Sequence, residues 1–489
     1  MKILQAASEG VPFCKTGGLA DVVGAVSLAL ARSGHSVQLV LPLYSQIDRA
    51  KFKLVKTNKL LYVPSPEGFD PISIWTKSLH KNLKVYFIQS ERYFNRKGFY
   101  GDRPDEAYID NDRRFVVFSR AVLELAKANK FSPDVVHAHD WQTGLIPAYL
   151  KCLYKNDPFF QSTGSLFTIH NMAFQGVFPN SSFAATGLPF SEFNPGGIEF
   201  YDHISFLKAG LVYSDAINTV SPTYATEIQS DPIYGHGLEG VLQDRSEQFR
   251  GILNGLDTTV WNPSTDRFLA QKFSVKTLAL RKKCKADLQR YCEFRVSDKI
   301  PLFGYVGRLD YQKGVDYLLD VIPALIQNEA HVVILGRGEL EYERALRVLQ
   351  LKHPDYFFYE NKFAEPLAHK IAAGSDIFLM PSRYEPCGLS QLIAMRYGSI
   401  PVVTPTGGLL DTVIDLNTDS DGTGFIASNK LSSEFLRCVF HALNMWGRKK
   451  KWAAVQSRAM SQDFSWGSPI RAYVNLYQNA VRWRQADNG

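Results

Sequence analysis

The sequence predicts an α/β protein with two doubly wound parallel sheets, and three observations carry that prediction. Short apolar runs of the kind that form buried strands alternate with helical patterns through most of the 489 residues. Glycine-bearing loops follow several of these apolar runs. A cluster of glycine, asparagine, aspartate and proline near residues 245–263 interrupts the alternation and indicates a domain boundary near residues 245–258.

The first expected unit is a strand, a helix and a second strand. Residues 2–7 form an apolar run that leads into a loop with Gly17 and Gly18. A helical pattern over residues 19–32 and an apolar run at residues 37–41 follow. This order predicts a parallel sheet, because parallel neighbours need a crossover connection between them.

The second half of the chain repeats this order more regularly. Its strands are expected at residues 301–306, 331–335, 356–359, 376–380 and 400–404. Its helices are expected at residues 315–326, 340–351, 367–373 and 389–397. The strands are continuous apolar runs, as in sheets that helices cover on both faces. Ligands of such sheets bind at the carboxyl ends of the strands, so two facing sheets would hold a ligand in the cleft between them.

Composition and charge narrow the class of protein. Hydrophobic residues make up 45% of the chain and charged residues 21%, as in ordinary globular proteins. The net charge of +7 is mild for this length, and the sequence carries no recognisable nucleic-acid-binding module. No run approaches ~18 apolar residues, and the N-terminal strand is too short for a signal sequence. With six scattered cysteines, we expect a cytoplasmic protein that binds neither nucleic acid nor membrane.

Two loops after expected strands combine glycine with cations. In the loop at residues 15–21, Lys15 stands beside two glycines whose N–H groups can approach an anion. In the loop at residues 307–314, Arg308 and Lys313 flank a strand-to-helix turn and could clamp a pyrophosphate. Taken alone, each loop is equally compatible with a tight turn that carries surface cations.

Two further loops offer a carboxylate and backbone donors. In the loop at residues 383–390, Glu385 can accept hydrogen bonds from sugar hydroxyls, and the N–H groups of residues 388–390 can hold phosphate oxygens. A plain helix cap is the alternative role for Glu385. The turn at residues 405–408 adds more backbone donors. Cys387 lies in the first of these loops, where packing is expected rather than a thiolate nucleophile.

Polar and aromatic groups also end two strands of the first half. The run at residues 135–141 contains His137 and His139, and the run at residues 166–171 contains His170. His137 and His139 could face the same way, because they are two residues apart on one strand. Zinc needs at least three convergent ligands, and no third partner for them is evident in the sequence. We therefore expect no metal site.

Together these motifs resemble those of bacterial glycogen synthases and plant starch synthases, which are retaining glucosyltransferases of the GT-B fold. That fold has two Rossmann-like domains that face each other across a deep cleft. The matching segments span nearly the whole chain in order, at residues 15–22, 139–141, 168–178, 234–242, 254–263, 307–314, 385–391, 396–398, 406–413 and 464–466.

The resemblance implies an organisation and an activity. Residues 1–247 would form an acceptor-side domain, residues 248–465 a nucleotide-sugar-binding domain, and residues 466–489 a helix that crosses back to the first domain. The implied reaction transfers glucose from ADP-glucose to the non-reducing end of an α-1,4-glucan such as glycogen, with retention of configuration.

The resemblance also implies roles for individual residues. His170 would lie against the donor glucose, Arg308 and Lys313 would bind its diphosphate, and Phe363 would stack on the base in place of a family tyrosine. The implied catalytic residues are Lys15, Asp140, His170, Arg308, Lys313 and Glu385. The implied donor-binding residues are Lys15, Gly17, Gly18, His170, Asn254, Arg308, Lys313, Phe363, Cys387, Gly388, Leu389, Ser390 and Thr406. The implied acceptor-binding residues are Glu9, Asp21, His139, Asp140 and Trp141.

These roles predict catalysis without a metal or another cofactor, ADP-glucose being a substrate. Two cations and oriented N–H groups would stabilise the negative charge that develops on the departing diphosphate. Hydrolases that retain configuration use a carboxylate pair about 5 Å apart, and the sequence offers no second acid beside Glu385. We therefore expect attack from the face that the diphosphate leaves, with the leaving phosphate taking the acceptor proton.

Departures from the family pattern leave alternatives open. Phe363 lacks the hydroxyl of the family tyrosine, and residues 309–311 differ from the usual Thr-Glu pair, so UDP-glucose is an alternative donor. Another GT-B glycosyltransferase, such as a sucrose- or trehalose-type synthase, and a non-catalytic glucan-binding protein are the remaining alternatives. The loop at residues 15–19 and the run at residues 385–389 disfavour another glycosyltransferase. A non-catalytic role is disfavoured by the presence of all of Lys15, His170, Arg308, Lys313 and Glu385. The oligomeric state stays open.

Overall fold

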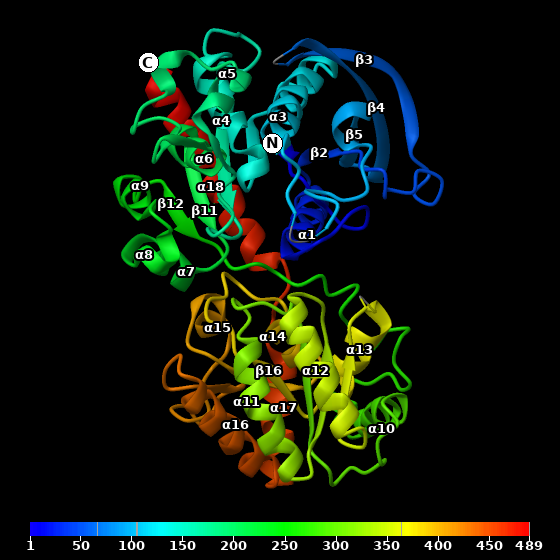
Figure 1. The fold of residues 1–489 in the computed structure, drawn as a ribbon. Helices are drawn as coiled ribbons and strands as arrows, with labels where there is room; N and C mark the ends of the chain where they lie inside the picture. The colour runs from blue at the N-terminus through cyan, green and yellow to red at the C-terminus, as the bar shows by residue number, and fades with distance from the viewer. Residues whose placement is uncertain (66, 104–105, 363, 489) are drawn as a thin grey trace. The chain divides into compact units, whose positions relative to one another are not determined.

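The chain divides into two α/β units, shown in Figure 1. This computed structural model describes residues 1–65, 67–103, 106–362 and 364–488. Unit 1 comprises Met1–Gly255 and Trp466–Gly489, and unit 2 comprises Leu256–Ser465. The boundary after Gly255 lies within the range 245–258 that the composition indicated. It lies beyond residue 247, where the resemblance implied it, because β12 (Phe249–Gly251) pairs with β11 (Ala216–Thr219) and completes the sheet of unit 1.

Unit 1 is built around a nine-stranded sheet in the described part of the chain, with the order β12–β11–β7–β6–β1–β2–β5–β4–β3. Its other strands are β1 (Lys2–Ala6), β2 (Ser36–Pro42), β3 (Val55–Ser65), β4 (Gly68–His80), β5 (Leu83–Gln89), β6 (Val135–His139) and β7 (Gly164–Ile169). All neighbours pair in parallel except β5–β4 and β4–β3, which are antiparallel. The strand order reverses between β1 and β6, and ligands of open parallel sheets bind at such a point.

Helices flank this sheet. The longer ones are α1 (Gly18–Arg32), α3 (Asn111–Ala128), α4 (Leu145–Cys152), α6 (Phe206–Tyr213), α7 (Pro222–Ser230) and α18 (Gly467–Asn488). Short elements are α2 (Glu91–Phe94), α5 (Phe183–Thr186), α8 (Pro232–Gly235), α9 (Glu239–Asp244), and a small sheet of β8 (Val177–Pro179), β9 (Glu199–Phe200) and β10 (His203–Ser205).

The C-terminal helix α18 belongs to unit 1, where it packs on β7 and β11 (Figure 1). Gly164 at the start of β7 permits this contact, because a Cβ there would lie 2.8 Å from the carbonyl carbon of Ala480. Tyr473 and Tyr477 of α18 are fully buried. The last segment of the chain therefore completes the core of the unit that the first segment begins.

Unit 2 holds a six-stranded parallel sheet in its described part, with the order β15–β14–β13–β16–β17–β18. Its strands are β13 (Leu302–Val306), β14 (His331–Leu335), β15 (Phe357–Glu360), β16 (Ile377–Met380), β17 (Ile400–Val403) and β18 (Phe425–Ile426). In sequence order this is 3-2-1-4-5-6, the order of dinucleotide-binding folds, and it reverses between β13 and β16.

The helices of unit 2 follow its strands as expected. They are α10 (Lys282–Tyr291), α11 (Val315–Gln327), α12 (Leu340–Lys352), α13 (Glu365–Gly374), α14 (Ser390–Arg396), α15 (Gly407–Thr412), α16 (Ser432–Trp446) and α17 (Lys449–Ser461). The expected strands and helices between residues 301 and 404 are confirmed to within a few residues. Every residue of β14, β16 and β17 is buried, which is why these strands read as unbroken apolar runs.

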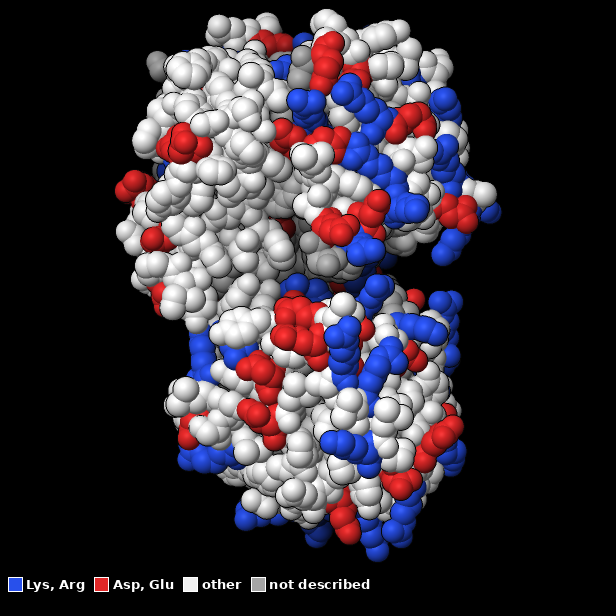
Figure 2. All heavy atoms as spheres, in the orientation of Figure 1, with Lys and Arg blue, Asp and Glu red and all other residues white. Residues whose placement is uncertain are grey.

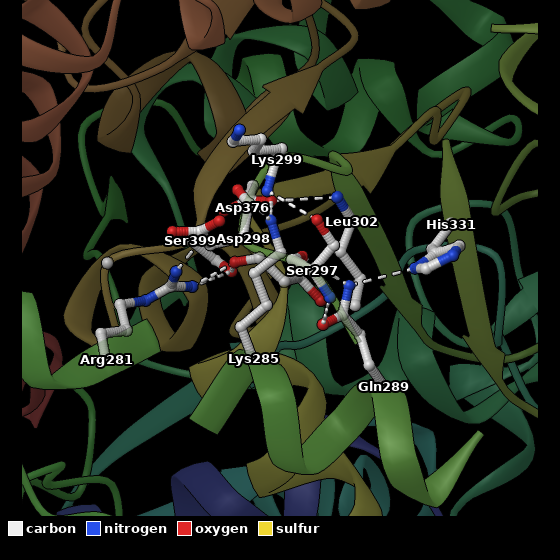
Figure 3. Close-up of polar contacts among 12 residues, drawn as sticks. Arg281, Lys285, Gln289, Ser297, Asp298, Lys299, Leu302, His331, Asp376 and Ser399 are labelled. Atoms are coloured by element: carbon white, nitrogen blue, oxygen red, sulfur yellow. Dashed lines mark hydrogen bonds and ion pairs between the residues drawn. The ribbon is translucent and has the colours of Figure 1, made fainter. Parts of the chain in front are cut away.

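A buried polar network holds α10 to the amino ends of the unit 2 strands (Figure 3). Asp376 precedes β16, and its Oδ2 accepts hydrogen bonds from Lys285 Nζ at 2.6 Å and from the Leu302 N–H at 3.0 Å. Arg281 donates to the carbonyl of Tyr397 and, at 3.0 Å, to Ser399 Oγ. These charged groups lie at the ends of the strands opposite to the loops that carry the expected site.

None of the helices within the described ranges combines the length and the apolar character that crossing a membrane requires.

Candidate active site

The expected site residues fall into two groups, one in each unit, and each group follows strands at or next to a reversal of strand order. In unit 1, Lys15, Asp140 and His170 follow β1, β6 and β7. In unit 2, Arg308 and Lys313 follow β13 and Glu385 follows β16. The placement agrees with the rule that ligands of open parallel sheets bind beyond the carboxyl ends of the strands.

The buried carboxylate of Glu9 stabilises the loop that follows β1. Glu9 is 2% exposed, and it accepts hydrogen bonds from the Thr16 N–H, from Thr16 Oγ1 at 2.6 Å and from Tyr100 Oη at 2.6 Å. These bonds fix the loop that carries Lys15. Apart from the adjoining backbone, no heavy atom of the described residues lies within 4 Å of a Cβ placed on Gly17 or Gly18. Packing therefore does not explain these glycines, and a ligand could approach their backbone.

Asp140 has an unusual backbone conformation for a residue with a side chain. Its φ of 56° and ψ of −180° lie in a region that is essentially restricted to glycine. Its Oδ1 accepts the His170 N–H at 2.7 Å. Burial raises the pKa of Asp140 to about 7, although the N–H groups of His170 and Asn171 act in the opposite direction. Strain of this kind persists at functional sites, where the surrounding structure enforces it.

Three histidines meet beside Asp140. His137 and His139 lie on one face of β6, with their ring centroids 3.9 Å apart, as the sequence suggested. His139 Nδ1 lies 3.0 Å from His170 Nε2, which comes from the end of β7. Burial lowers the pKa of His170 to about 3 and the pKa values of the other two well below their usual value.

Sequence reasoning missed this third histidine because the register that brings β6 and β7 together is a property of the sheet. Among the residues with described positions, no group of three or more His, Cys, Asp or Glu side chains could hold a metal ion. The three rings lie in contact at tilted angles, and a hydrogen bond joins His139 to His170.

The indole of Trp141 lies next to the three histidines. It is 9% exposed and packs edge-on against Phe115 at 4.9 Å, with Phe178 at 5.7 Å. Gly176, with φ of 57°, lies against its indole, where a Cβ would come within 2.5 Å of the ring. The indole is thus fixed in place by its neighbours.

The unit 2 group is tied together across two loops. Lys313 Nζ donates to Glu385 Oε2 at 2.5 Å, and Ser382 Oγ donates to the same oxygen at 2.9 Å. Arg308 donates from Nη2 to Gln312 Oε1 at 2.8 Å. Ser382 and Gln312 have no distinctive sequence signal, and only the fold reveals that they position the charged groups.

Each expected donor-binding cation is paired with a carboxylate of its own unit. Lys15 lies 2.7 Å from Asp21, Arg308 lies 2.6 Å from Asp310, and Lys313 lies 2.5 Å from Glu385. The Lys313–Glu385 pair is the most buried of the three. An incoming diphosphate would therefore compete with carboxylates for these cations.

The remaining expected donor-binding residues of unit 2 lie in the adjoining turns. The Gly388 backbone has φ of 74°, the thiol of Cys387 is buried, and Ser390 Oγ donates to the Val306 carbonyl. Thr406 is buried, and the N–H of Gly408 donates to the Glu385 carbonyl at 3.1 Å.

Asn254 and Phe363 are the two other expected donor-binding residues. Asn254 of unit 1 is 7% exposed, and its Oδ1 has no hydrogen-bond partner in the described part of the chain. Phe363 lies outside the described residues, so its expected stacking on the base stays a prediction.

A cavity of about 420 Å³ opens at another place in unit 1 and is lined by Lys151, Asp215, Arg245, Trp483 and Asp487, among others. Lys151 pairs with Asp215 at 2.8 Å and with Asp487 at 2.7 Å. Arg245 donates to three carbonyls at the C-terminal end of α6. The charged side chains that line this cavity thus pair with one another or donate to backbone carbonyls. Asp215 lies at the amino end of β11, away from the expected site.

The fold and these loops together define the class of protein. The catalytic domain of starch synthase IV from Arabidopsis thaliana, bound to ADP and acarbose, matches 98% of this chain and 99% of its own with a TM-score of 0.92 and 34% identity. Sucrose-phosphate synthase from Thermosynechococcus elongatus matches with a TM-score of 0.61 and 17% identity, which shows a shared fold. The chain is thus a glycosyltransferase of the GT-B fold.

Sequence comparisons narrow this class to one family. Residues 2–244 match the starch synthase catalytic domain, and residues 293–454 match the glycosyl transferases group 1. The glycogen synthase of Elusimicrobium minutum is 44% identical over 98% of this chain and 100% of its own length. The glycogen synthase of Koribacter versatilis is 44% identical over 99% of both chains. The chain belongs to the glycogen synthase family, as its motifs indicated.

Proposed function

We propose that this protein transfers glucose from ADP-glucose to the non-reducing end of an α-1,4-glucan and retains the anomeric configuration. The observation that carries the proposal is the meeting of Arg308, Lys313 and Glu385 beyond β13 and β16. It offers two cations for a diphosphate beside a carboxylate for sugar hydroxyls. The ADP bound to the starch synthase IV relative supports adenosine diphosphate as the leaving group.

The leaving side of the reaction develops negative charge on the diphosphate. Arg308 and Lys313 would stabilise this charge once the diphosphate displaces Asp310 and Glu385 from them. Lys15, beside two unobstructed glycines, would add a third cation. Three cations would neutralise much of the diphosphate charge, so the proposal uses no metal and no further cofactor.

The sugar side of the reaction develops positive charge at the anomeric carbon. His170 would place its neutral ring against the donor glucose near the 6-hydroxyl, and its carbonyl near the anomeric carbon. A neutral ring fits this role, because a cation there would oppose the developing charge. Glu385, released by Lys313, would accept hydrogen bonds from the other hydroxyls.

Retention would follow from attack on the face that the diphosphate leaves. The acceptor hydroxyl oxygen forms the new bond to the anomeric carbon as the bond to the phosphate oxygen breaks. The proton of that hydroxyl passes to the departing phosphate, so no enzyme nucleophile is needed. A covalent glucosyl–protein adduct trapped by mass spectrometry would contradict this mechanism.

A weakly charged surface supports a neutral polymer as acceptor. In Figure 2, the part of unit 1 around α5, α6 and α9 shows mostly uncharged side chains. Phe174, four residues after His170, is half exposed, and Phe190 and Tyr201 are largely exposed. Aromatic side chains with accessible faces suit sugar rings, which carry no charge of their own.

The test is incorporation of labelled glucose into glycogen from ADP-glucose and, side by side, from UDP-glucose. We expect strong transfer from ADP-glucose, linkages that an α-1,4-specific hydrolase removes, and an α configuration by NMR. A preference for UDP-glucose would keep the fold and mechanism and overturn the donor. Transfer from neither donor, in folded protein, would contradict the proposal and favour a glucan-binding role.

A further inference from the structure

We propose that His139 is a positioning residue that fixes the tautomer of His170, so that His170 Nδ1 carries the proton and donates a hydrogen bond to the donor sugar. The inference rests on the proposed function for the identity of the sugar, but the tautomer itself is a property of unit 1 alone. It also gives His139 a task different from the contact with acceptor that the family resemblance implied.

The hydrogen bond between the two rings requires one donor and one acceptor. His139 Nδ1 lies 3.0 Å from His170 Nε2, and both rings are buried. Burial holds both imidazoles neutral, so each ring carries one N–H and one bare nitrogen. Only two arrangements are possible: His139 donates to His170, or His170 donates to His139.

The second nitrogen of His139 decides between them. His139 Nε2 is buried and has no hydrogen-bond partner among the residues that the structure describes. If His170 were the donor, this Nε2 would carry a buried N–H with nothing to accept it. If His139 is the donor, this Nε2 is a bare acceptor, and buried donors without partners are rarer than under-satisfied acceptors. The structure therefore favours His139 Nδ1–H as the donor, and His170 keeps its own proton on Nδ1.

The ring of His139 is held in this orientation by His137 behind it. Thr168 Oγ1 donates its single proton to Asn218 Oδ1 at 2.5 Å, so His137 Nε2, 2.6 Å from the same hydroxyl, must be the donor there. His137 Nδ1 is then an acceptor, and Tyr477 Oη of α18 donates to it at 2.8 Å. These bonds fix the proton of His137 on Nε2, and its ring packs against that of His139 at 3.9 Å between centroids.

The backbone of His170 is fixed as well. Its N–H donates to Asp140 Oδ1 at 2.7 Å, so the residue is held at its main chain and at Nε2 of its ring. These two bonds leave Nδ1 as the ring nitrogen that can meet a ligand. A sugar hydroxyl facing it would have to accept, which makes this position selective for a group with an oxygen lone pair.

Nitrogen NMR of histidine-labelled, substrate-free protein tests the tautomer directly. Long-range ¹H–¹⁵N spectra distinguish a protonated Nδ1 from a protonated Nε2, and the His170 signals are assigned by their loss in His170→Gln. We expect His170 as the Nδ1–H form and His139 as the Nδ1–H form. A His170 ring protonated at Nε2 would overturn the proposal.

Three variants separate positioning from packing. His139→Phe keeps a flat ring but cannot donate, and we expect it to release His170 into a mixture of tautomers. His139→Asn places an amide N–H near the Nδ1 position and should keep the Nδ1–H form. Tyr477→Phe removes a bond from the same buried cluster but not the one to His170, and should also keep it. An unchanged His170 tautomer in folded His139→Phe would overturn the role of His139, and if that variant fails to fold, the wild-type spectrum still decides the tautomer.

A kinetic comparison links the tautomer to the reaction. The ratio of kcat/KM for ADP-glucose to that for ADP-6-deoxyglucose measures the hydrogen bond to the 6-hydroxyl, and we expect a ratio of roughly 10- to 100-fold. The ratio should collapse in His139→Phe and persist in His139→Asn. The expected spectrum without any glucose transfer would contradict the proposed function and leave the tautomer standing. Efficient glucose transfer by a protein whose His170 is protonated at Nε2 would contradict the inference about His139 and leave the proposed function standing.

Discussion

Lys313 and Glu385 form a partly buried ion pair in which each residue also has an expected task in the reaction. We expect Lys313→Ala to lower kcat/KM for the donor by about 100-fold or more, because a cation at the leaving group is lost. It should also lower the free energy of unfolding by about 1–3 kcal/mol, because the Glu385 carboxylate then keeps one hydrogen bond from the described residues, that of Ser382. Initial rates and urea denaturation measure the two effects.

The double variant Lys313→Ala/Glu385→Gln is the matched control for this prediction. A neutral amide no longer needs a cation, so stability should recover while activity stays low. Recovery of activity together with stability would show that Lys313 acts only through folding.

Asp140 provides a prediction about pH. Its folded-state pKa of about 7 lies above the unfolded value of 3.8, so the unfolded state releases its proton first as the pH rises. The stability that this group contributes is present below pH 4 and is lost as the pH rises to 7. Asp140→Asn keeps an oxygen for the His170 N–H, and we expect its stability relative to wild type to increase with pH by at most about 1.4 kcal/mol per unit. A constant difference in stability across pH 4–7 would contradict the raised pKa.

The charged residues of the expected site stand out in the sequence, but the residues that contact them in the fold do not. Lys15 and Arg308 are recognisable as site candidates because each is a cation beside glycine in a loop that follows a strand, a pattern that suits anion binding in any parallel sheet. The support that Glu9, Tyr100 and Ser382 give to these loops depends on packing between distant segments. The meeting of His139 and His170 likewise depends on which strand pairs with β6.

At the scale of an element, α10 depends on the network around Asp376. Lys285 and Asp376 are each less than a tenth exposed, so removing the carboxylate leaves a buried ammonium without its counter-charge. We expect Asp376→Ala to lower the free energy of unfolding by about 3–5 kcal/mol. Urea denaturation followed by tryptophan fluorescence measures the loss, and Trp446, whose ring centroid lies 5.0 Å from Lys285 Nζ, is one of the seven tryptophans that report.

Asp287 on the same helix is the control, because it pairs with Lys370 of α13 where both side chains are partly exposed. Asp287→Asn should cost no more than about 1 kcal/mol. Equal effects of the two variants would show that burial does not determine the cost.

The elements that the sequence predicted best are those that the sheet buries on both faces. The strands of unit 2 are unbroken apolar runs, and their ends agree closely with prediction. The hairpin of β3 and β4 was not predicted, because its strands are half exposed and its outward positions include Val55 and Leu60. Apolar residues on a solvent-facing strand blur the alternation that marks it.

At the scale of the whole molecule, unit 1 is made of two separate stretches of the chain. We expect a chain that ends at Ser465 to lose the folded state of unit 1, because α18 brings Ile470, Tyr473, Leu476 and Tyr477 into its core. Each such side chain contributes ~1.5–3 kcal/mol, and together they approach the whole stability of a domain. Circular dichroism and limited proteolysis measure the outcome.

A chain that ends at Gln485 is the control, since it keeps these buried residues and loses the exposed pair of Lys151 with Asp487. It should remain folded. A stable unit 1 in the Ser465 truncation would show that α18 is dispensable.

This division of unit 1 also bears on the order in which a ribosome releases the protein. The first 255 residues emerge without α18, and β7 and β11 then wait uncovered while the ~210 residues of unit 2 are made. At 5–20 residues per second that delay lasts ~10–40 s. Unit 2 has emerged in full before α18 completes unit 1, so the part of the protein that is translated first is the part that finishes folding last.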